Sequence, residues 1–204
     1  LEAVTVPSNL EVGLKKWSPQ NISLETNPEA IIWAVDGVDD NSVAFAARLM
    51  EKGVEVRIID KEALLSKQSL SRGSIAVLAM DNPEYEDLSE TVNSIASDLD
   101  ISVLSIESGF GAEELPDWGG RHFRLLERPQ IAILSQSGFS SYDVGVSWWS
   151  LDHHLGIRHS QIDASLVNYA DLRRYNTIIL PSGYRDMGEY EKKVLSDWME
   201  QGGT

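Results

Sequence analysis

The chain has 204 residues, of which 42% are hydrophobic and 24% are charged, as expected for one large or two small globular domains. It contains no cysteine, which excludes disulfides, thiolate zinc sites and cysteine nucleophiles. Its 17 Lys and Arg residues against 32 Asp and Glu residues give a net charge of −15, which repels nucleic acids and anionic membrane surfaces. No apolar run approaches the ~20 residues of a membrane span, so we expect neither a nucleic-acid partner nor a membrane anchor in this chain.

The negative charge is concentrated in the first part of the chain. Residues 1–127 contain 23 acidic and 10 basic side chains, whereas residues 128–204 contain 9 acidic and 7 basic ones. Such a change in charge indicates two units that join near Pro129. The predicted domains are an irregular lead-in at 1–28, an acidic α/β domain at 29–127 and a second α/β domain at 128–204.

Short apolar runs alternate with helical patterns through the acidic domain. Two strands joined by a helix favour parallel pairing, because the crossover returns the chain in the same direction. Glycines and a proline in residues 109–126 indicate a loop that leaves the sheet. The predicted strands span 31–35, 54–60, 74–80 and 101–106, with a further strand-like pattern at 1–6, and the predicted helices lie between Asn41 and Gly53 and from Pro83 to Leu99.

The second domain repeats this order of elements. In its first helix, helical spacing predicts that Val144, Trp148, Leu151 and Leu155 face inward. The chain ends where a further strand is expected, so we expect the second unit to be truncated. The predicted fold class is α/β, with two flavodoxin-like three-layer units whose sheets are mostly parallel. The strands of the second domain are predicted at 130–134, 159–163 and 176–181, and its helices at 142–155 and 189–201.

Two clusters of polar residues are explained more simply by local structure than by a bound ligand. The loop Asp36–Asn41 lies where dinucleotide-binding folds carry a glycine-rich turn, but its three carboxylates would repel a pyrophosphate. An alternative is that these carboxylates hold a hard cation, although helix capping and turn formation also account for them. His153 and His154 are neighbours and point about 100° apart on a helix. We therefore predict no metal site and no catalytic residue in this chain.

Four serines and one glycine lie close together in the loop after the first strand of the second domain. Open α/β sheets often bind ligands at such strand-to-helix loops, although capping by Ser140 or Ser141 explains part of the cluster. The turn Pro181–Gly183 follows another predicted strand, so we expect it to face the same edge of the sheet. The candidate ligand-binding residues are Ser135, Ser137, Gly138, Ser182 and Gly183.

The second domain also carries an ordered series of motifs. They are the strand 131–134, a helix, the segment Asp171–Gly183 and a helix that closes in Trp198–Gly203. This order resembles the first half of the class I glutamine amidotransferase-like fold. In that family a Pro-Gly-Gly turn helps to form an oxyanion hole, and here Ser182 replaces the first glycine. The resemblance implies that the family's nucleophile and histidine would lie beyond Thr204.

A wider combination of motifs covers residues 30–204. An acidic α/β unit is followed by Asp117–Gly120, Arg128–Leu134, Tyr142–Gly145 and Trp149. This combination resembles the region downstream of the peptidase domain in large bacterial zinc carboxypeptidase-like proteins of the carboxypeptidase A class. The resemblance implies an amidotransferase-like accessory domain without catalytic activity, in a secreted or periplasmic protein. It also implies that the partner is the peptidase domain of the same parent chain, that zinc belongs to that domain, and that this chain holds no cofactor.

The leading hypothesis from the sequence is a non-catalytic accessory fragment that packs against the peptidase domain or helps to capture substrate. On this hypothesis, enzyme activity belongs to the parent zinc metallocarboxypeptidase. The second hypothesis is a small-ligand module that binds a peptide or a sugar at the serine loop and at Pro181–Gly183. The third is an amidotransferase-like hydrolase whose nucleophile lies outside this chain.

Overall fold

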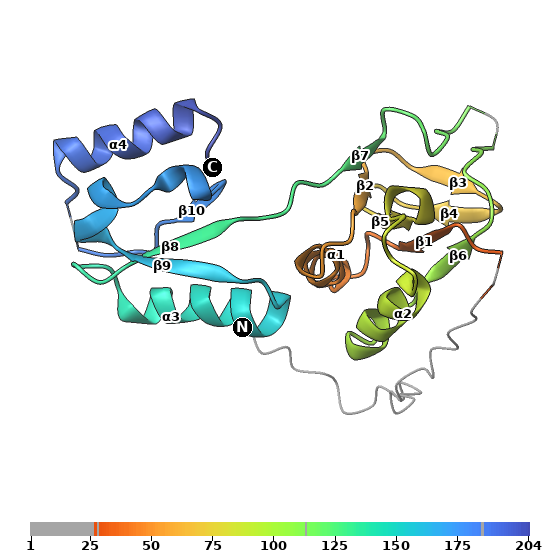
Figure 1. Cartoon of the computed structure of the whole chain (residues 1–204), viewed down its shortest axis with the longest axis horizontal. Coiled ribbons are helices and arrows are strands. Elements are labelled where there is room, and N and C mark those ends of the chain that lie inside the picture. Colours follow the sequence, from red (N-terminus) through yellow and green to blue (C-terminus); the bar gives the residue numbers. More distant parts are fainter. Residues whose placement is uncertain (1–26, 28, 113, 185) are drawn as a thin grey trace, which may run out of the picture.

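The computed structural model describes residues 27, 29–112, 114–184 and 186–204. The predicted lead-in at 1–28 and its strand-like pattern lie outside the described residues, except for Asn27. The chain is mixed α/β, as predicted, and its two main sheets lie on either side of residues 126–130 (Figure 1). No helix in the described ranges has the length and hydropathy that a membrane crossing requires.

The first unit combines short strands with two α-helices. Its elements are β1 (Ile32–Val35), α1 (Ser42–Glu51), β2 (Arg57–Ile59), β3 (Ala63–Leu65), β4 (Gln68–Leu70), β5 (Ile75–Leu78), the 3-10 helix η1 (Ala79–Asp81), α2 (Leu88–Asp98), β6 (Leu104–Ile106) and β7 (Phe123–Leu125). In the described chain, the main sheet has the order β6-β1-β5-β2-β7, and every neighbouring pair is antiparallel. β3 and β4 form a separate hairpin.

The predicted parallel pairing is wrong for this unit. α1 and α2 do connect strands that run in the same direction, but one antiparallel strand lies between the members of each pair. A helical crossover fixes the relative direction of the strands that it joins and does not require them to be adjacent. The result is the β-α-β-β-α-β arrangement of ferredoxin-like folds, with the β3–β4 hairpin inserted and β7 added at the edge.

The two faces of this sheet are covered by different kinds of structure. Trp33 and Val35 of β1 pack with α1 and α2 on one face. Ile32 and Ala34 point to the other face, where the β3–β4 hairpin and Trp118 cover them. Successive side chains of a strand point to opposite faces of the sheet, and in β1 both faces are covered, so both sets of side chains are buried. Because both helices lie on one face, the first unit is not the flavodoxin-like three-layer unit that we expected.

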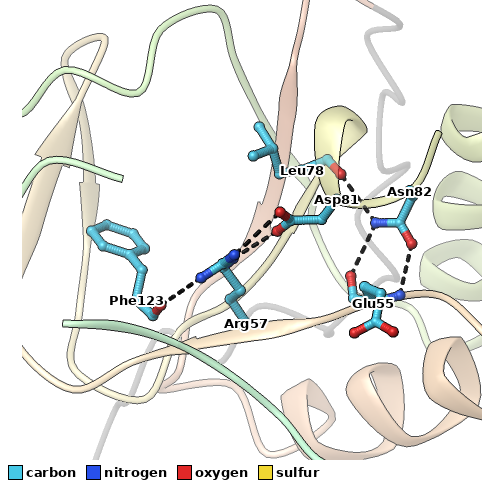
Figure 2. A network of polar contacts seen from close by, with 6 residues as sticks. All are labelled: Glu55, Arg57, Leu78, Asp81, Asn82 and Phe123. Atoms are coloured by element: carbon cyan, nitrogen blue, oxygen red, sulfur yellow. Dashed lines mark hydrogen bonds and ion pairs between the residues drawn. The ribbon is translucent and has the colours of Figure 1, made fainter. Parts of the chain in front are cut away.

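Polar side chains tie β2 to the segment that follows β5 (Figure 2). The amide of Asn82, which is 5% exposed, accepts a hydrogen bond from the backbone N–H of Glu55 at 2.7 Å and donates to the carbonyls of Glu55 and Leu78 at 3.1 and 3.0 Å. Next to it, Arg57 donates two hydrogen bonds to Asp81, at 2.6 and 3.1 Å. The hydrogen bond to Asp81 raises the pKa of Arg57 above its ordinary value. These contacts hold the sheet where the backbone ladder between β2 and β5 ends.

The second unit is a parallel sheet between helices. Its elements are β8 (Ile131–Ser135), α3 (Ser141–Trp149), the π-helix η2 (Ser150–Leu155), β9 (His159–Asp163), the 3-10 helices η3 (Ala164–Tyr169) and η4 (Leu172–Arg174), β10 (Thr177–Ile179) and α4 (Glu189–Glu200). The order is β10-β8-β9, and both pairs are parallel, as predicted for this unit. α3 and α4 lie on opposite sides of the sheet (Figure 1).

The outward face of α3 is unusually apolar. No side chain of α3 is buried, and Val146, Trp148 and Trp149 are all exposed. The prediction that Trp148 faces inward is therefore wrong, and its side chain is 43% exposed. The cause is the position of the helix, which contacts the sheet mainly through Val144 and through Leu151 in the following η2.

The two units meet where α1 contacts the second sheet. Ala47 of α1 belongs to the same buried apolar cluster as Ile131 and Ile133 of β8 and Leu151 of η2. At the end of α1, the carboxylate of Glu51 forms salt bridges with Arg128, at 3.1 Å, and with Arg158. Burial raises the pKa of Glu51, but the hydrogen bonds from the two arginines outweigh it and hold the pKa below its ordinary value. Charge pairing and apolar packing thus join the units.

We expect Asn82→Ala to lower the free energy of unfolding by about 2–3 kcal/mol, because it removes three hydrogen bonds and leaves a backbone N–H without its partner. Denaturant unfolding measures this change. The matched control is Asn93→Ala in α2, whose amide forms no hydrogen bond with the described residues, and we expect it to change stability by less than about 0.5 kcal/mol. Equal losses in the two variants would show that the Asn82 contacts are not stabilising.

Candidate functional site

The connections of the second sheet create a crevice at one of its edges. After β8 the chain turns to α3 on one face, and after β10 it turns to α4 on the other. Two neighbouring parallel strands whose following loops leave in opposite directions form a topological switch point, where open α/β sheets bind ligands. In this chain the switch point lies at the carboxyl ends of β8 and β10.

A hollow of about 470 Å³ lies at this switch point. It is formed by the loop after β8, the first turn of α3 and the loop after β10. Of the predicted ligand-binding residues, Ser182 and Gly183 line it. Ser135, Ser137 and Gly138 do not. The lining residues are Phe139, Ser140, Ser141, Tyr142, Ser182, Gly183 and Tyr184.

The two loops are joined by their backbones. The N–H of Ser140 donates to the carbonyl of Ser182 at 2.8 Å, and the N–H of Tyr184 donates to the carbonyl of Gly138 at 2.9 Å. These bonds surround an antiparallel bridge that includes Gly183. A Cβ on Gly183 would lie 2.5 Å from the Gly138 carbonyl oxygen, so only glycine allows the loops to come this close.

Ser135 and Ser137 support the loop and do not line the hollow. The hydroxyl of Ser137 donates to the carboxylate of Asp163 at 2.7 Å, and that of Ser135 donates to the carbonyl of Ile162 at 3.4 Å. Both contacts connect the loop to the end of β9. They hold a strained stretch, because Gln136 and Ser137 have φ values of 58° and 44°, each costing roughly 1–2 kcal/mol in a residue other than glycine. Strain of this kind is often found at functional sites.

Hydroxyl groups and aromatic rings surround the hollow. Ser140 caps α3 by accepting a hydrogen bond from the N–H of Asp143 at 3.4 Å, and the hydroxyl of Ser182 donates to the carboxylate of Asp143. The rings of Tyr142 and Tyr184 are 86% and 101% exposed. The arrangement can donate and accept several hydrogen bonds and offers two aromatic faces to a bound molecule.

The sequence analysis did not select the two tyrosines or Asp143. Tyr142 directly follows the serine loop and Tyr184 directly follows the Pro181–Gly183 turn. Because both loops were expected at the same edge of the sheet, this adjacency could have predicted that both tyrosines lie beside the candidate ligand-binding residues. The contact between Asp143 and Ser182 joins residues 39 positions apart, and no local pattern indicates it.

The other clusters that the sequence drew attention to form local contacts. In the loop Asp36–Asn41, the carboxylate of Asp36 accepts from the N–H of Val38 at 3.1 Å and that of Asp39 accepts from the N–H of Asn41 at 2.9 Å. The ring of His153 contacts that of Trp149, with centroids 5.1 Å apart and the ring planes tilted by 38°. Within the described ranges, no group of three or more His, Asp or Glu side chains is arranged to hold a metal ion.

Comparisons of the chain with protein-family models, with curated proteins and with solved structures find no significant match. The site is therefore assigned from its geometry.

We expect Gly183→Ala to destabilise the protein by about 1–3 kcal/mol, because the new Cβ forces the loops apart. Gly145→Ala in α3 is the matched control. A Cβ there meets nothing within 4 Å, and alanine in a helix is more stable than glycine by roughly 0.5–1 kcal/mol. Thermal unfolding compares the two variants, and a Gly183→Ala variant that unfolds at the same temperature as Gly145→Ala, or at a higher one, would contradict the close contact at Gly183.

Proposed function

We propose that this chain is a non-catalytic accessory module of a secreted or periplasmic zinc carboxypeptidase-like protein, and that it binds a small, neutral, hydroxyl-rich ligand such as a sugar. The first part rests on the sequence resemblance of residues 30–204. The second rests on one observation, that three serines and two exposed tyrosines are among the residues that line a single hollow at the switch point. Binding at this hollow would help the parent protein to capture a substrate that carries a neutral, hydroxyl-rich group such as a sugar.

The chemistry of the hollow matches a neutral polyhydroxy molecule. The hydroxyl of Ser140, which accepts from the N–H of Asp143, can still donate to a ligand, and that of Ser182, which donates to the Asp143 carboxylate, can still accept. Ser141 adds a third hydroxyl to the lining. Sugar hydroxyls donate and accept hydrogen bonds and so can pair with both kinds of group. Aromatic rings such as those of Tyr142 and Tyr184 pack against flat apolar surfaces and hydrogen-bond through their hydroxyls. A sugar ring presents both an apolar face and a rim of hydroxyls, so it uses both kinds of group.

An anion fits this hollow less well. The carboxylate of Asp143 is hydrogen-bonded to Ser182 and already occupies the first turn of α3, where the helix dipole favours negative charge. The net charge of −15 also repels anions in solution. A peptide carries an anionic carboxylate at its end, so it is the second choice of ligand for this hollow. It would bind through its amides and not through that carboxylate.

The hydroxyls lining the hollow are suited to binding more than to nucleophilic attack. A serine nucleophile needs a base within hydrogen-bond reach. The described residues that line the hollow include no histidine or lysine, and the partner of Ser182 is a carboxylate, a weak base for an alcohol.

Calorimetric titration with a panel of neutral mono- and disaccharides tests the proposed binding. Tyr184→Ala removes one aromatic face, and we expect it to weaken binding by about 1 kcal/mol, or roughly fivefold. Ser182→Ala removes a hydroxyl, and we expect a similar loss. The matched control is Tyr169→Ala in η3, because Tyr169 is 87% exposed and lies outside the hollow.

The proposed binding is wrong if no saccharide or neutral peptide in the panel binds the unmodified chain. It is also wrong if Tyr169→Ala weakens binding as much as Tyr184→Ala does. Circular dichroism of each variant checks that the fold is unchanged.

A second candidate function is packing against the peptidase domain through α3. The observation that favours it is the apolar outward face formed by Val146, Trp148 and Trp149, all exposed. Exposed apolar patches on soluble proteins often mark interaction sites, and tryptophan is enriched among the residues that dominate binding energy. On this proposal, the peptidase domain covers α3 in the parent protein.

Sedimentation of this chain with the peptidase-containing part of its parent protein tests the second candidate. We expect Trp149→Ala to weaken the association by about 2 kcal/mol or more, and the exposed Tyr190→Ala in α4 to leave it unchanged. Equal effects of the two substitutions, or no association of the unmodified chain, would exclude this face as the docking surface.

A further inference from the structure

A second hollow lies at the opposite edge of the parallel sheet, at the junction of the two units. Its volume is about 270 Å³, and it is lined by residues that come before or begin β8 and β9, together with Glu51 of α1 and the end of η4. Three arginines, Arg128, Arg158 and Arg174, contribute to its wall. Each comes from a different segment of the chain: Arg128 from the connection between the units, Arg158 from the residue before β9, and Arg174 from η4.

This concentration of positive charge is exceptional in an acidic chain. Residues 128–204 contain 7 Lys and Arg side chains, and three of them line this one hollow. Like charges repel one another unless an anion lies between them. Among the described residues that line the hollow, Glu51 is the acidic one, so the arginines outnumber the carboxylate by three to one.

Glu51 satisfies only part of the hydrogen-bonding capacity of these arginines. It forms an ion pair with Nη2 of Arg128 at 3.1 Å and accepts a hydrogen bond from Nε of Arg158, whereas each guanidinium has five N–H donors. Arg174 forms no salt bridge with the residues that the structure describes. The side chains of Arg128 and Arg158 are 46% and 80% exposed, so solvent and dissolved anions reach them.

We propose that this hollow binds a compact oxyanion, a phosphate or a carboxylate group, through Arg128, Arg158 and Arg174. The planar guanidinium matches two oxygens of such a group with parallel hydrogen bonds. His159 and Ser160 at the start of β9 add polar groups to the same wall. The bound anion would supply the negative charge that Glu51 alone does not, at the point where Arg128 and Arg158 also join the two units.

The site differs in place and in chemistry from the hydroxyl-lined hollow at the carboxyl ends of β8 and β10. Neutral hydroxyl-rich ligands suit that end, and anions suit this one. The proposal of anion binding at this hollow can therefore be tested independently of the proposal of saccharide binding at the other hollow.

Titration of the chain with inorganic phosphate, followed by amide chemical shifts at constant ionic strength, tests the proposal. A second titration uses a short neutral peptide with either a free or an amidated carboxyl terminus, which distinguishes a phosphate from a carboxylate ligand. We expect saturable shifts at residues 128, 130, 131 and 158–160 with phosphate or with the free-carboxyl peptide. We expect Arg174→Gln to weaken this binding at least tenfold.

The matched control is Arg173→Gln. Arg173 is the neighbour of Arg174, pairs with Asp171 at 2.7 Å and lies outside the lining of this hollow, so we expect its loss to leave binding unchanged. Both arginines are exposed, and the fold is expected to tolerate either substitution. The proposal is overturned if neither anion gives saturable shifts beyond those of sodium chloride, or if the two variants lose equal affinity.

Discussion

The Cα of Gly183 packs against the backbone of Gly138 and Phe139, where an added Cβ would lie 2.5 Å from a carbonyl oxygen and 2.8 Å from a Cα. This close approach brings together two loops that follow different strands and lead to opposite faces of the sheet. The hydroxyls of Ser140 and Ser182 and the neighbouring tyrosine rings then surround one hollow. Without this close approach at Gly183, the two loops would move apart and the residues that line the hollow would separate. The proposed ligand site therefore depends on one residue without a side chain.

The parallel sheet presents different chemistry at its two edges. Serine hydroxyls and the Asp143 carboxylate lie at the carboxyl ends of β8 and β10, whereas arginines and Glu51 lie at the amino ends of β8 and β9. The second edge is also where α1 of the ferredoxin-like unit packs on the sheet. An anion bound there would lie beside the contacts that join the units, so its binding would be coupled to the stability of the junction.

Local patterns in the sequence predicted most strands and helices, but they could not predict the order of strands in the first sheet. Apolar runs identify β1, β2 and β5 as buried, and nothing in those runs states that β5 lies between the other two. The hairpin of β3 and β4 has strands of three residues each, too short for a period of two to be recognised. In the candidate site, Ser182 and Gly183 of the Pro181–Gly183 turn line the hollow, and their role as ligand-binding residues stays a prediction. Ser137, also a predicted candidate, does not line the hollow, because its hydroxyl is bonded to Asp163 of the next strand.

The central claim is that the loops after β8 and β10 form a ligand-binding hollow. Amide chemical-shift mapping of the isotopically labelled chain during titration with neutral saccharides tests it most directly. The account predicts saturable shifts at residues 139–142 and 182–184, with little change at residues 128–131 or in the first unit. Shifts confined to other parts of the chain, or no shift at high saccharide concentration, would contradict it.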